Sequence, residues 1–144
     1  MENKSVIDIF KGRKGKSIRP FKKSAVVILL LEKEDGYHIL FEVRALNLKS
    51  QPGDICLPGG KVEEGEEYKE TASRELKEEL GYSDEDFQII GEMDFFVSPY
   101  GSIIYPFVGE AFRMPDRFNN NEVEEVFSVP LEYFLKNNPI CHSI

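Results

Sequence analysis

The chain has 144 residues, of which 41% are apolar and 12% aromatic, so it is long enough for one globular domain with a substantial core. Its net charge of −8 is unevenly divided, because residues 1–23 carry eight basic and two acidic side chains while residues 24–144 carry ten basic and 24 acidic ones. An acidic body repels nucleic acid and polyphosphates unless cations neutralise its carboxylates, which argues against a nucleic-acid partner and favours a metal-using site.

The sequence carries no obvious signal for a membrane or an oxidising compartment. Its longest apolar run, Ala25–Leu31, has seven residues, far fewer than the ~20 needed to cross a bilayer. The N-terminus lacks the apolar core and cleavage site of a secretory signal. Cys56 and Cys141 are not in CxxC spacing, so they indicate neither a disulfide framework nor a thiolate zinc site. We therefore predict a cytoplasmic location and no membrane partner.

The first predicted element is a short helix near Ser5–Phe10, within a basic N-terminal arm that covers residues 1–23. Residues 24–144 are predicted to form the folded domain. Two interpretations of the arm stay open: contact with the phosphates of a substrate, or a solvated flexible segment. Its cations after the helix are Lys11, Arg13, Lys14, Lys16, Arg19, Lys22 and Lys23.

A hairpin is predicted next. Ser24–Glu32 is rich in Val, Ile and Leu and predicts a strand, and Tyr37–Arg44 predicts its partner, because Gly36 between them can adopt a positive φ. The following stretch, Gln51–Gly60, is punctuated by Pro and Gly. We predict a short strand at Asp54–Leu57 and a non-repetitive backbone after it.

A helix is predicted at Tyr68–Leu80, because Ala72, Leu76 and Leu80 recur every four residues, and Gly81 is expected to cap its end. Strands are then predicted at Phe87–Phe96 and Ile103–Phe112. Pro106 and Gly109 interrupt the second of these, which predicts an edge strand or a bulge. The last predicted elements are a loop at Asn119–Asn121, a strand at Glu122–Val129 and a short helix at Leu131–Leu135.

Three carboxylates share one face of the predicted helix, since Glu75 and Glu79 are one turn apart and Glu78 lies beside both. Like charges at this spacing weaken a helix unless cations sit among them, and hard carboxylate oxygens select Mg²⁺ or Mn²⁺. Arg74 could fix one carboxylate through a bidentate pair. Gly60 lets the preceding loop approach the helix, where its backbone carbonyl could reach the metal. For the glutamates alone, a solvated acidic face is the competing interpretation.

The full pattern extends this cluster. It reads Gly, five residues, Glu, seven residues, Arg-Glu-apolar, any residue, Glu-Glu, any residue, Gly and an apolar or aromatic residue, and it runs from Gly60 to Tyr82 with every fixed position present. This pattern closely resembles the Nudix box. The resemblance implies an α/β fold (α+β by some schemes) with a mixed sheet sandwiched between helices. It implies Mg²⁺- or Mn²⁺-dependent hydrolysis of the phosphoanhydride of a nucleoside diphosphate linked to another group. By this resemblance the metal set is Glu75, Glu78, Glu79 and Gly60, and the catalytic set is Glu75, Glu78 and Arg74.

The general base is left open at this point. Glu75 and Glu78 are candidates from the helix. Glu122, Glu124 and Glu125 are an alternative if the loop before their strand folds over the site, although a plain acidic surface explains them equally well.

The segment Arg44–Gly60 is similar to the second signature of coenzyme A pyrophosphatases, and the wider likeness spans about residues 24–137. Gln51 and Leu57 depart from it, since many members have His and Phe there. The similarity implies a small-molecule nucleotide substrate, coenzyme A or an acyl derivative, split to 3′,5′-ADP and (acyl-)4′-phosphopantetheine. The substrate-binding residues would be Arg44, Lys49 and Gln51.

Two alternatives to this substrate stay open. The chain could hydrolyse ADP-ribose or another nucleotide, or it could be a Nudix domain that binds nucleotides without catalysis. Members of this subfamily normally continue with a further strand and a final helix, whereas this chain ends at Ile144. We therefore expect part of the apolar surface of the sheet to be uncovered. A second copy of the chain could cover it in a homodimer, the protein could be poorly stable, or the chain could be a truncated product.

Overall fold

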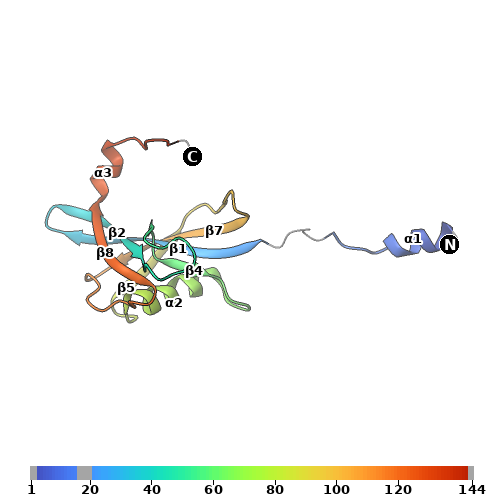
Figure 1. Cartoon of the computed structure of the whole chain (residues 1–144), viewed down its shortest axis with the longest axis horizontal. Coiled ribbons are helices and arrows are strands. Elements are labelled where there is room, and N and C mark those ends of the chain that lie inside the picture. The colour runs from blue at the N-terminus through green and yellow to red at the C-terminus, as the bar shows by residue number, and fades with distance from the viewer. Residues whose placement is uncertain (1–2, 16–20, 143–144) are drawn as a thin grey trace.

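The computed structural model describes residues 3–15 and 21–142 (Figure 1). The helices are α1 (Asn3–Phe10), α2 (Tyr68–Leu80) and α3 (Leu131–Lys136). The strands are β1 (Lys22–Lys33), β2 (Gly36–Arg44), β3 (Ile55–Cys56), β4 (Gly59–Lys61), β5 (Phe87–Glu92), β6 (Phe96–Val97), β7 (Ser102–Ala111) and β8 (Val123–Pro130).

One mixed sheet contains all the strands of the described residues, and β1 lies near its middle. On one side β1 pairs in parallel with β7 along ten residues. Its other side is shared, because β4 pairs with its first half and β2 with its second half, both antiparallel. β2 continues the sheet to β8 and β3, and β7 continues it to β5 and β6. The short strand β4 is thereby fixed beside the centre of the sheet.

The core lies between the sheet and α2. Alternate residues of β1 from Ala25 to Leu31 are buried against the apolar stripe of α2, Ala72, Leu76 and Leu80, because successive side chains of a strand point to opposite faces. The β1 residues between them are half-buried on the other face.

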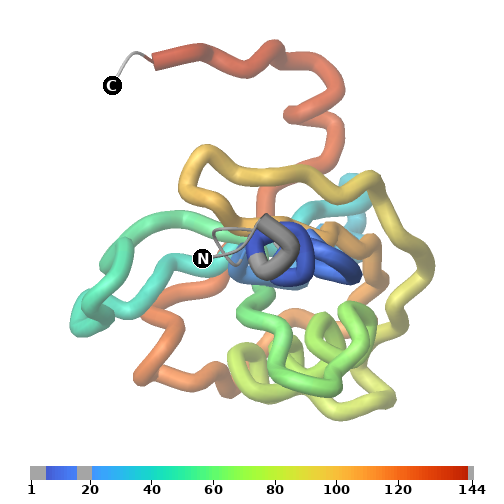
Figure 2. The backbone as a smooth tube through the Cα atoms, turned by 90° about the vertical axis from the view of Figure 1, so that its right-hand side faces the viewer, coloured from blue at the N-terminus to red at the C-terminus, as the bar shows by residue number. Residues whose placement is uncertain are grey.

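The helices on the two faces differ in how much they cover. Figure 2, in which α1 points toward the viewer, shows α2 on one side of the sheet and α3 on the other. Phe134 of α3 approaches Phe41 of β2, with ring centroids 5.9 Å apart, but α3 has no buried residue. The predicted mixed sheet is confirmed, and among the described residues α2 is the helix that packs on it closely.

The helix α2 has the bounds that its apolar period predicts. Glu67 and Glu70 form a reciprocal capping box at its start, and Gly81, with φ of 66°, caps its end in the left-handed conformation. Both ends are therefore specified by local sequence.

Three strand predictions were wrong in detail. β7 is not an edge strand, because it lies between β1 and the pair β5 and β6. Pro106 is tolerated there because it falls where the antiparallel partner changes from β5 to β6, and the irregularity lies in β5, between Ile89 and Gly91. The segment predicted as one strand, Phe87–Phe96, is therefore two strands. Gly59 and Gly60 also form β4 rather than a non-repetitive segment.

The helix α1 lies apart from the sheet (Figure 1). β1 begins at Lys22, two residues before the predicted boundary of the domain, and two of the predicted arm cations, Lys16 and Arg19, lie outside the described residues. Within the described ranges, no helix has the length and apolar character needed to span a membrane.

Leu76→Ala is expected to lower the free energy of unfolding by about 2–5 kcal/mol, because Leu76 is fully buried between α2 and the sheet and its truncation leaves a cavity. Urea unfolding followed by circular dichroism measures the change. The control is Leu135→Ala, since Leu135 is 78% exposed on α3 and should change stability by less than about 0.5 kcal/mol. Equal losses in the two variants would contradict the described core.

Candidate active site

Three carboxylates from two segments meet at one edge of α2. One oxygen from each of Glu75, Glu79 and Glu122 lies within 4.8 Å of the other two. Glu75 and Glu79 are 9% and 5% exposed, and Glu122 comes from the loop before β8. That loop is tied to the end of the helix, because the backbone N–H of Asn119 donates to the carbonyl of Glu79 at 2.9 Å. The structure thus brings together two of the predicted metal ligands and one of the alternative general bases.

Glycines allow this convergence. A Cβ on Gly60 would lie 2.3 Å from Oε1 of Glu75, so any other residue there would displace that carboxylate from its present position. The neighbouring Gly59 donates its N–H to Oε1 of Glu79 at 2.9 Å. A Cβ on Gly81 would lie 2.1 Å from the carbonyl oxygen of Arg117, so this glycine also lets the loop that carries Glu122 pass close to α2.

Arg74 organises the outer border of the cluster. Its Nε and Nη2 donate to the two oxygens of Glu66 at 2.7 and 3.1 Å, and its Nη1 donates to Glu75 at 3.0 Å. The predicted bidentate pair therefore exists, but its partner is Glu66. Nη2 also binds the carbonyl of Lys61, which joins α2 to the end of β4.

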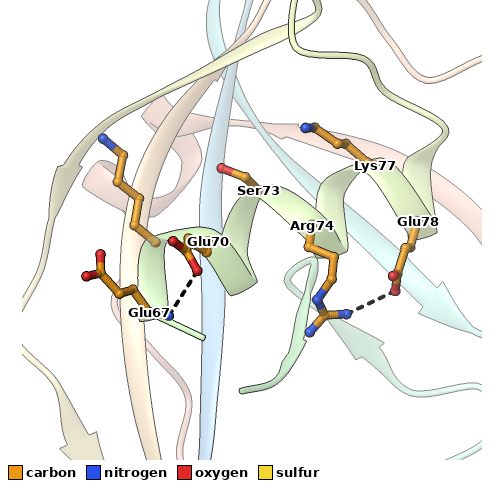
Figure 3. A pocket seen from close by; sticks show the side chains of 7 residues that line it. Glu67, Glu70, Ser73, Arg74, Lys77 and Glu78 are labelled. Carbon is orange, nitrogen blue, oxygen red and sulfur yellow. Dashed lines mark hydrogen bonds and ion pairs between the residues drawn. The ribbon is translucent and has the colours of Figure 1, made fainter. Parts of the chain in front are cut away.

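Glu78 occupies a different position from the other helix glutamates. Its Oε2 accepts from Nη1 of Arg74 at 3.1 Å on the outer side of α2, and its side chain is half exposed (Figure 3). A hollow of about 620 Å³ lies on that side, and it is lined by Glu67, Lys69, Glu70, Ser73, Arg74, Lys77 and Glu78. None of the three convergent carboxylates lines it. This hollow is therefore distinct from the place where they meet.

The charge environment separates Glu66 from Glu75. The hydrogen bond from Arg74, with a second from Thr71, lowers the pKa of Glu66 to about 2. Burial instead raises the pKa of Glu75 to about 7, and the nearby guanidinium of Arg74 only partly offsets it. A buried carboxyl with this pKa is protonated over part of the neutral range unless a cation favours its charged form.

A fourth carboxyl group lies beneath the cluster. Glu42 of β2 is 2% exposed, and its carboxyl lies against that of Glu79. Burial raises the pKa of both groups. Since an ionised carboxylate has no donor, a hydrogen bond can join the two only when one of them carries a proton. Oε2 of Glu42 has no hydrogen-bond partner among the described residues.

The loop after β2, which carries the predicted substrate-binding residues Lys49 and Gln51, begins beside the cluster. The N–H of Ala45 donates to the backbone carbonyl of Glu122 at 3.0 Å, directly after Arg44. The guanidinium of Arg44 donates to the carbonyls of Ser50 and Gln51 at 3.0 to 3.3 Å, so it folds the loop. Lys49 and Gln51 are exposed on that loop.

One residue of the cluster, Glu42, was not predicted from the sequence, although it carries a signal, since it is a charged residue at an inward position of a predicted strand. Glu66 was predicted only as the first glutamate of the pattern, without the role of partner to Arg74 that the structure gives it. Glu124 and Glu125 are exposed on β8, so Glu122 alone of the three joins Glu75 and Glu79.

The donor set fits a hard divalent cation. It consists of carboxylate oxygens, two of them buried, with excess negative charge that Arg74 does not fully neutralise. Oxygen ligands of this kind suit Mg²⁺ or Mn²⁺. A cation there would remove both the like-charge repulsion and the tendency of Glu75 to hold a proton.

Comparison with known proteins is consistent with this site. The NUDIX domain matches residues 21–142. The peroxisomal coenzyme A diphosphatase ndx-8 of Caenorhabditis elegans is 35% identical over 118 residues, which cover 76% of this chain and 50% of that protein. The peroxisomal coenzyme A diphosphatase NUDT7 of Mus musculus is 34% identical, covering 78% and 49%. The chain thus spans about half the length of these curated relatives.

Solved structures share the fold. The MutT protein of Methanosarcina mazei Go1 superposes with a TM-score of 0.62 at 26% identity, covering 85% of this chain and 86% of that one. A Nudix hydrolase of M. Smegmatis, RenU, gives a TM-score of 0.60 at 20% identity, covering 78% and 73%. At 20% identity the second likeness concerns the fold alone.

The metal-free protein is expected to lose stability as the pH rises from about 4.5 to about 7. The pKa of Glu75 is about 7 in the folded state and 4.5 in the unfolded state, so the unfolded chain ionises first and unfolding becomes easier across this window. The loss should reach up to about 3 kcal/mol, and urea unfolding in EDTA measures it. Glu75→Gln should make the fall shallower without abolishing it, because Glu42 and Glu79, whose pKa values burial also raises, contribute to the same loss. A wild-type profile that rises through this window would contradict the buried carboxyl.

Arg74→Met is expected to lower the free energy of unfolding by about 2 kcal/mol, because it leaves Glu66 and Glu75 without their charged donor. The control on the same helix is Lys77→Met, whose partner Asp84 is largely exposed and whose loss should cost less than about 1 kcal/mol. Thermal and urea unfolding of both variants provide the measurement. If the two changes are alike, Arg74 does not organise the cluster.

Proposed function

The chain belongs to the NUDIX domain family, and from this premise we propose that it is a pyrophosphohydrolase whose substrate is coenzyme A or an acyl derivative. The products would be 3′,5′-ADP and (acyl-)4′-phosphopantetheine. The observation that carries the proposal is the convergence of Glu75, Glu79 and Glu122 at the glycine-lined edge of α2. The choice of substrate is supported by the second signature in Arg44–Gly60 and by the relatives named as coenzyme A diphosphatases.

In this proposal Glu75 and Glu79 hold Mg²⁺ or Mn²⁺. The cation, when bound, neutralises phosphate charge and lowers the pKa of a coordinated water. Arg74 holds the carboxylate of Glu75 in place, and the N–H of Gly59 holds that of Glu79. Glu78 forms an ion pair with Arg74. We therefore assign Glu78 the role of keeping the guanidinium of Arg74 in position.

The proton acceptor in this proposal is Glu122. Glu75 and Glu79 are each fixed by a donor from the fold, whereas Glu122 is less buried and comes from a loop. A carboxylate so placed can take a proton from the attacking water at one of its oxygens. Its loop position also puts it against Ala45, where the proposed substrate loop begins.

Binding of the nucleotide is assigned to the loop after β2. Lys49 and Gln51 are exposed there and can meet phosphate oxygens, Lys49 as a charge and Gln51 through its amide. Arg44 acts mainly by folding the loop through the carbonyls of Ser50 and Gln51. A homodimer partner and a cytoplasmic location stay predictions, and two of the relatives are named as peroxisomal.

Wild-type protein with Mg²⁺ or Mn²⁺ is expected to hydrolyse coenzyme A faster than ADP-ribose, dinucleotides or nucleoside triphosphates, with products separated by chromatography. Glu79→Gln should lower turnover of coenzyme A by at least about 100-fold while the circular dichroism spectrum is retained. Glu132→Gln is the control, since Glu132 is exposed on α3 and should leave turnover unchanged.

The outcomes of this panel separate the alternatives. Faster cleavage of ADP-ribose or another nucleotide would replace the proposed substrate and keep the chemistry. Nucleotide binding without any metal-dependent turnover would identify a domain that binds nucleotides without catalysis, and the proposal would fail.

A further inference from the structure

The carboxylate of Glu122 is held differently from the other two carboxylates of the cluster. Arg74 donates to the carboxylate of Glu75, and the N–H of Gly59 donates to that of Glu79. The hydrogen bonds of Glu122 to the described residues are those of its main chain. Its carboxylate nevertheless brings one oxygen within 4.8 Å of the other two groups. The main chain that carries Glu122 therefore sets the place of its carboxylate.

Asn119 connects the main chain of Glu122 to the end of α2. The backbone N–H of Asn119 donates to the carbonyl of Glu79 at 2.9 Å. The carbonyl of Asn119 accepts from the N–H of Glu122 at 3.0 Å and from that of Val123 at 2.8 Å. The carbonyl of Glu79 lies in the last turn of α2, where it has no donor within the helix. Two hydrogen bonds through one residue thus join the main chains of Glu79 and Glu122.

The side chain of Asn119 shapes this turn. Its Oδ1 accepts from the N–H of Asn121 at 3.0 Å, the contact by which an asparagine stabilises a turn two residues further on. The φ of Asn119 is not positive, so the backbone conformation would permit most other residues. The amide oxygen is therefore the feature that favours asparagine at this position, and aspartate can supply the same acceptor.

We propose that Asn119 is a positioning residue that holds the carboxylate of Glu122 beside those of Glu75 and Glu79, where it can accept a proton. This inference rests on the proposed function, since Glu122 is the proton acceptor proposed there. A displacement of about 1 Å at a reacting group can cost about 100-fold in rate. A residue that fixes the main chain of the proton acceptor can therefore control turnover without touching the substrate.

Turnover of coenzyme A with Mn²⁺ by the full chain is the first measurement. Asn119→Ala removes the amide oxygen and is expected to lower kcat about 10- to 100-fold. KM should change less than about 2-fold, because Glu122 accepts a proton and does not hold the substrate. Asn119→Asp keeps the acceptor and should retain kcat within about 3-fold. A loss of kcat in both variants would contradict the inference.

Asn120→Ala is the matched control. It removes an amide side chain from the same turn, and this side chain makes no hydrogen bond with the described residues. Its kcat should differ from that of the wild type by less than about 2-fold. A loss as large as that in Asn119→Ala would show that any change in this turn lowers activity, and the role given to Asn119 would be wrong.

A double-mutant cycle with Glu122→Gln tests whether Asn119 acts through Glu122. Substitutions of residues that act as a unit are not additive, so Asn119→Ala should lower kcat by less than about 2-fold when Glu122→Gln is already present. A merely structural role would give the same loss in both backgrounds, and this result would overturn the inference.

Amide hydrogen exchange of the metal-free protein, followed by NMR, tests the same contact without turnover. The N–H of Ala45 donates to the carbonyl of Glu122 at 3.0 Å and so reports on the main chain of Glu122. Asn119→Ala should accelerate exchange of the Ala45 and Glu122 amides about 2- to 10-fold, as expected for the loss of one hydrogen bond. Asn119→Asp should exchange as the wild type does. Unchanged exchange in Asn119→Ala overturns the inference whatever the activity.

The inference and the proposed function can fail separately. A wild type that hydrolyses no nucleotide overturns the proposed function, and the role of Asn119 in positioning a proton acceptor falls with it. A wild type that hydrolyses coenzyme A together with an unchanged kcat in Asn119→Ala overturns this inference alone.

Discussion

The structure depends on how four carboxyl groups are accommodated where α2 meets the sheet. Glu75, Glu79 and Glu42 are buried and Glu122 lies beside them, so their mutual repulsion and loss of hydration oppose folding. The fold provides one guanidinium and one backbone N–H to offset this. These partners fix the geometry but leave negative charge uncompensated. The site is thereby suited to accept positive charge from outside the chain, which is the physical basis of the proposed metal-dependent chemistry.

The helix α2 connects this charge to the core. Its apolar stripe packs on β1. Glu75 and Glu79 directly precede Leu76 and Leu80 of this stripe, so the same packing brings them close to β4. Arg74 then ties the helix to Glu66 and to the carbonyl of Lys61, which closes the loop between β4 and the helix. Packing positions the helix, and ion pairs set the directions of its carboxylates. The two effects act on opposite sides of the same three helical turns.

The sequence was informative where local patterns decide the structure. The period of the apolar residues and the capping glycine gave α2 correctly, and Glu75 and Glu79 with it. The sequence did not predict the contacts between segments that are far apart in the chain. The sequence does not distinguish Glu122 from Glu124 and Glu125. Only Glu122 lies in the loop that a hydrogen bond from the N–H of Asn119 to the carbonyl of Glu79 holds at the end of α2. Pro106 suggested an edge strand because proline has no N–H to donate to a sheet. The structure places β7 inside the sheet, because Pro106 falls where the antiparallel partner changes from β5 to β6, and strand propensity does not reveal that change.

The long parallel pairing of β1 with β7 also has a consequence for the order of folding. The paired residues are about 80 positions apart in the chain, so the central ladder of the sheet cannot close until the polypeptide is complete through Ala111. Closing so large a loop has a high entropic cost before any contact compensates for it, and such non-local pairing makes folding slow. The hairpin of β1 and β2 is therefore exposed on a growing chain well before its partner is synthesised, and its apolar faces are the surfaces that a chaperone would have to protect.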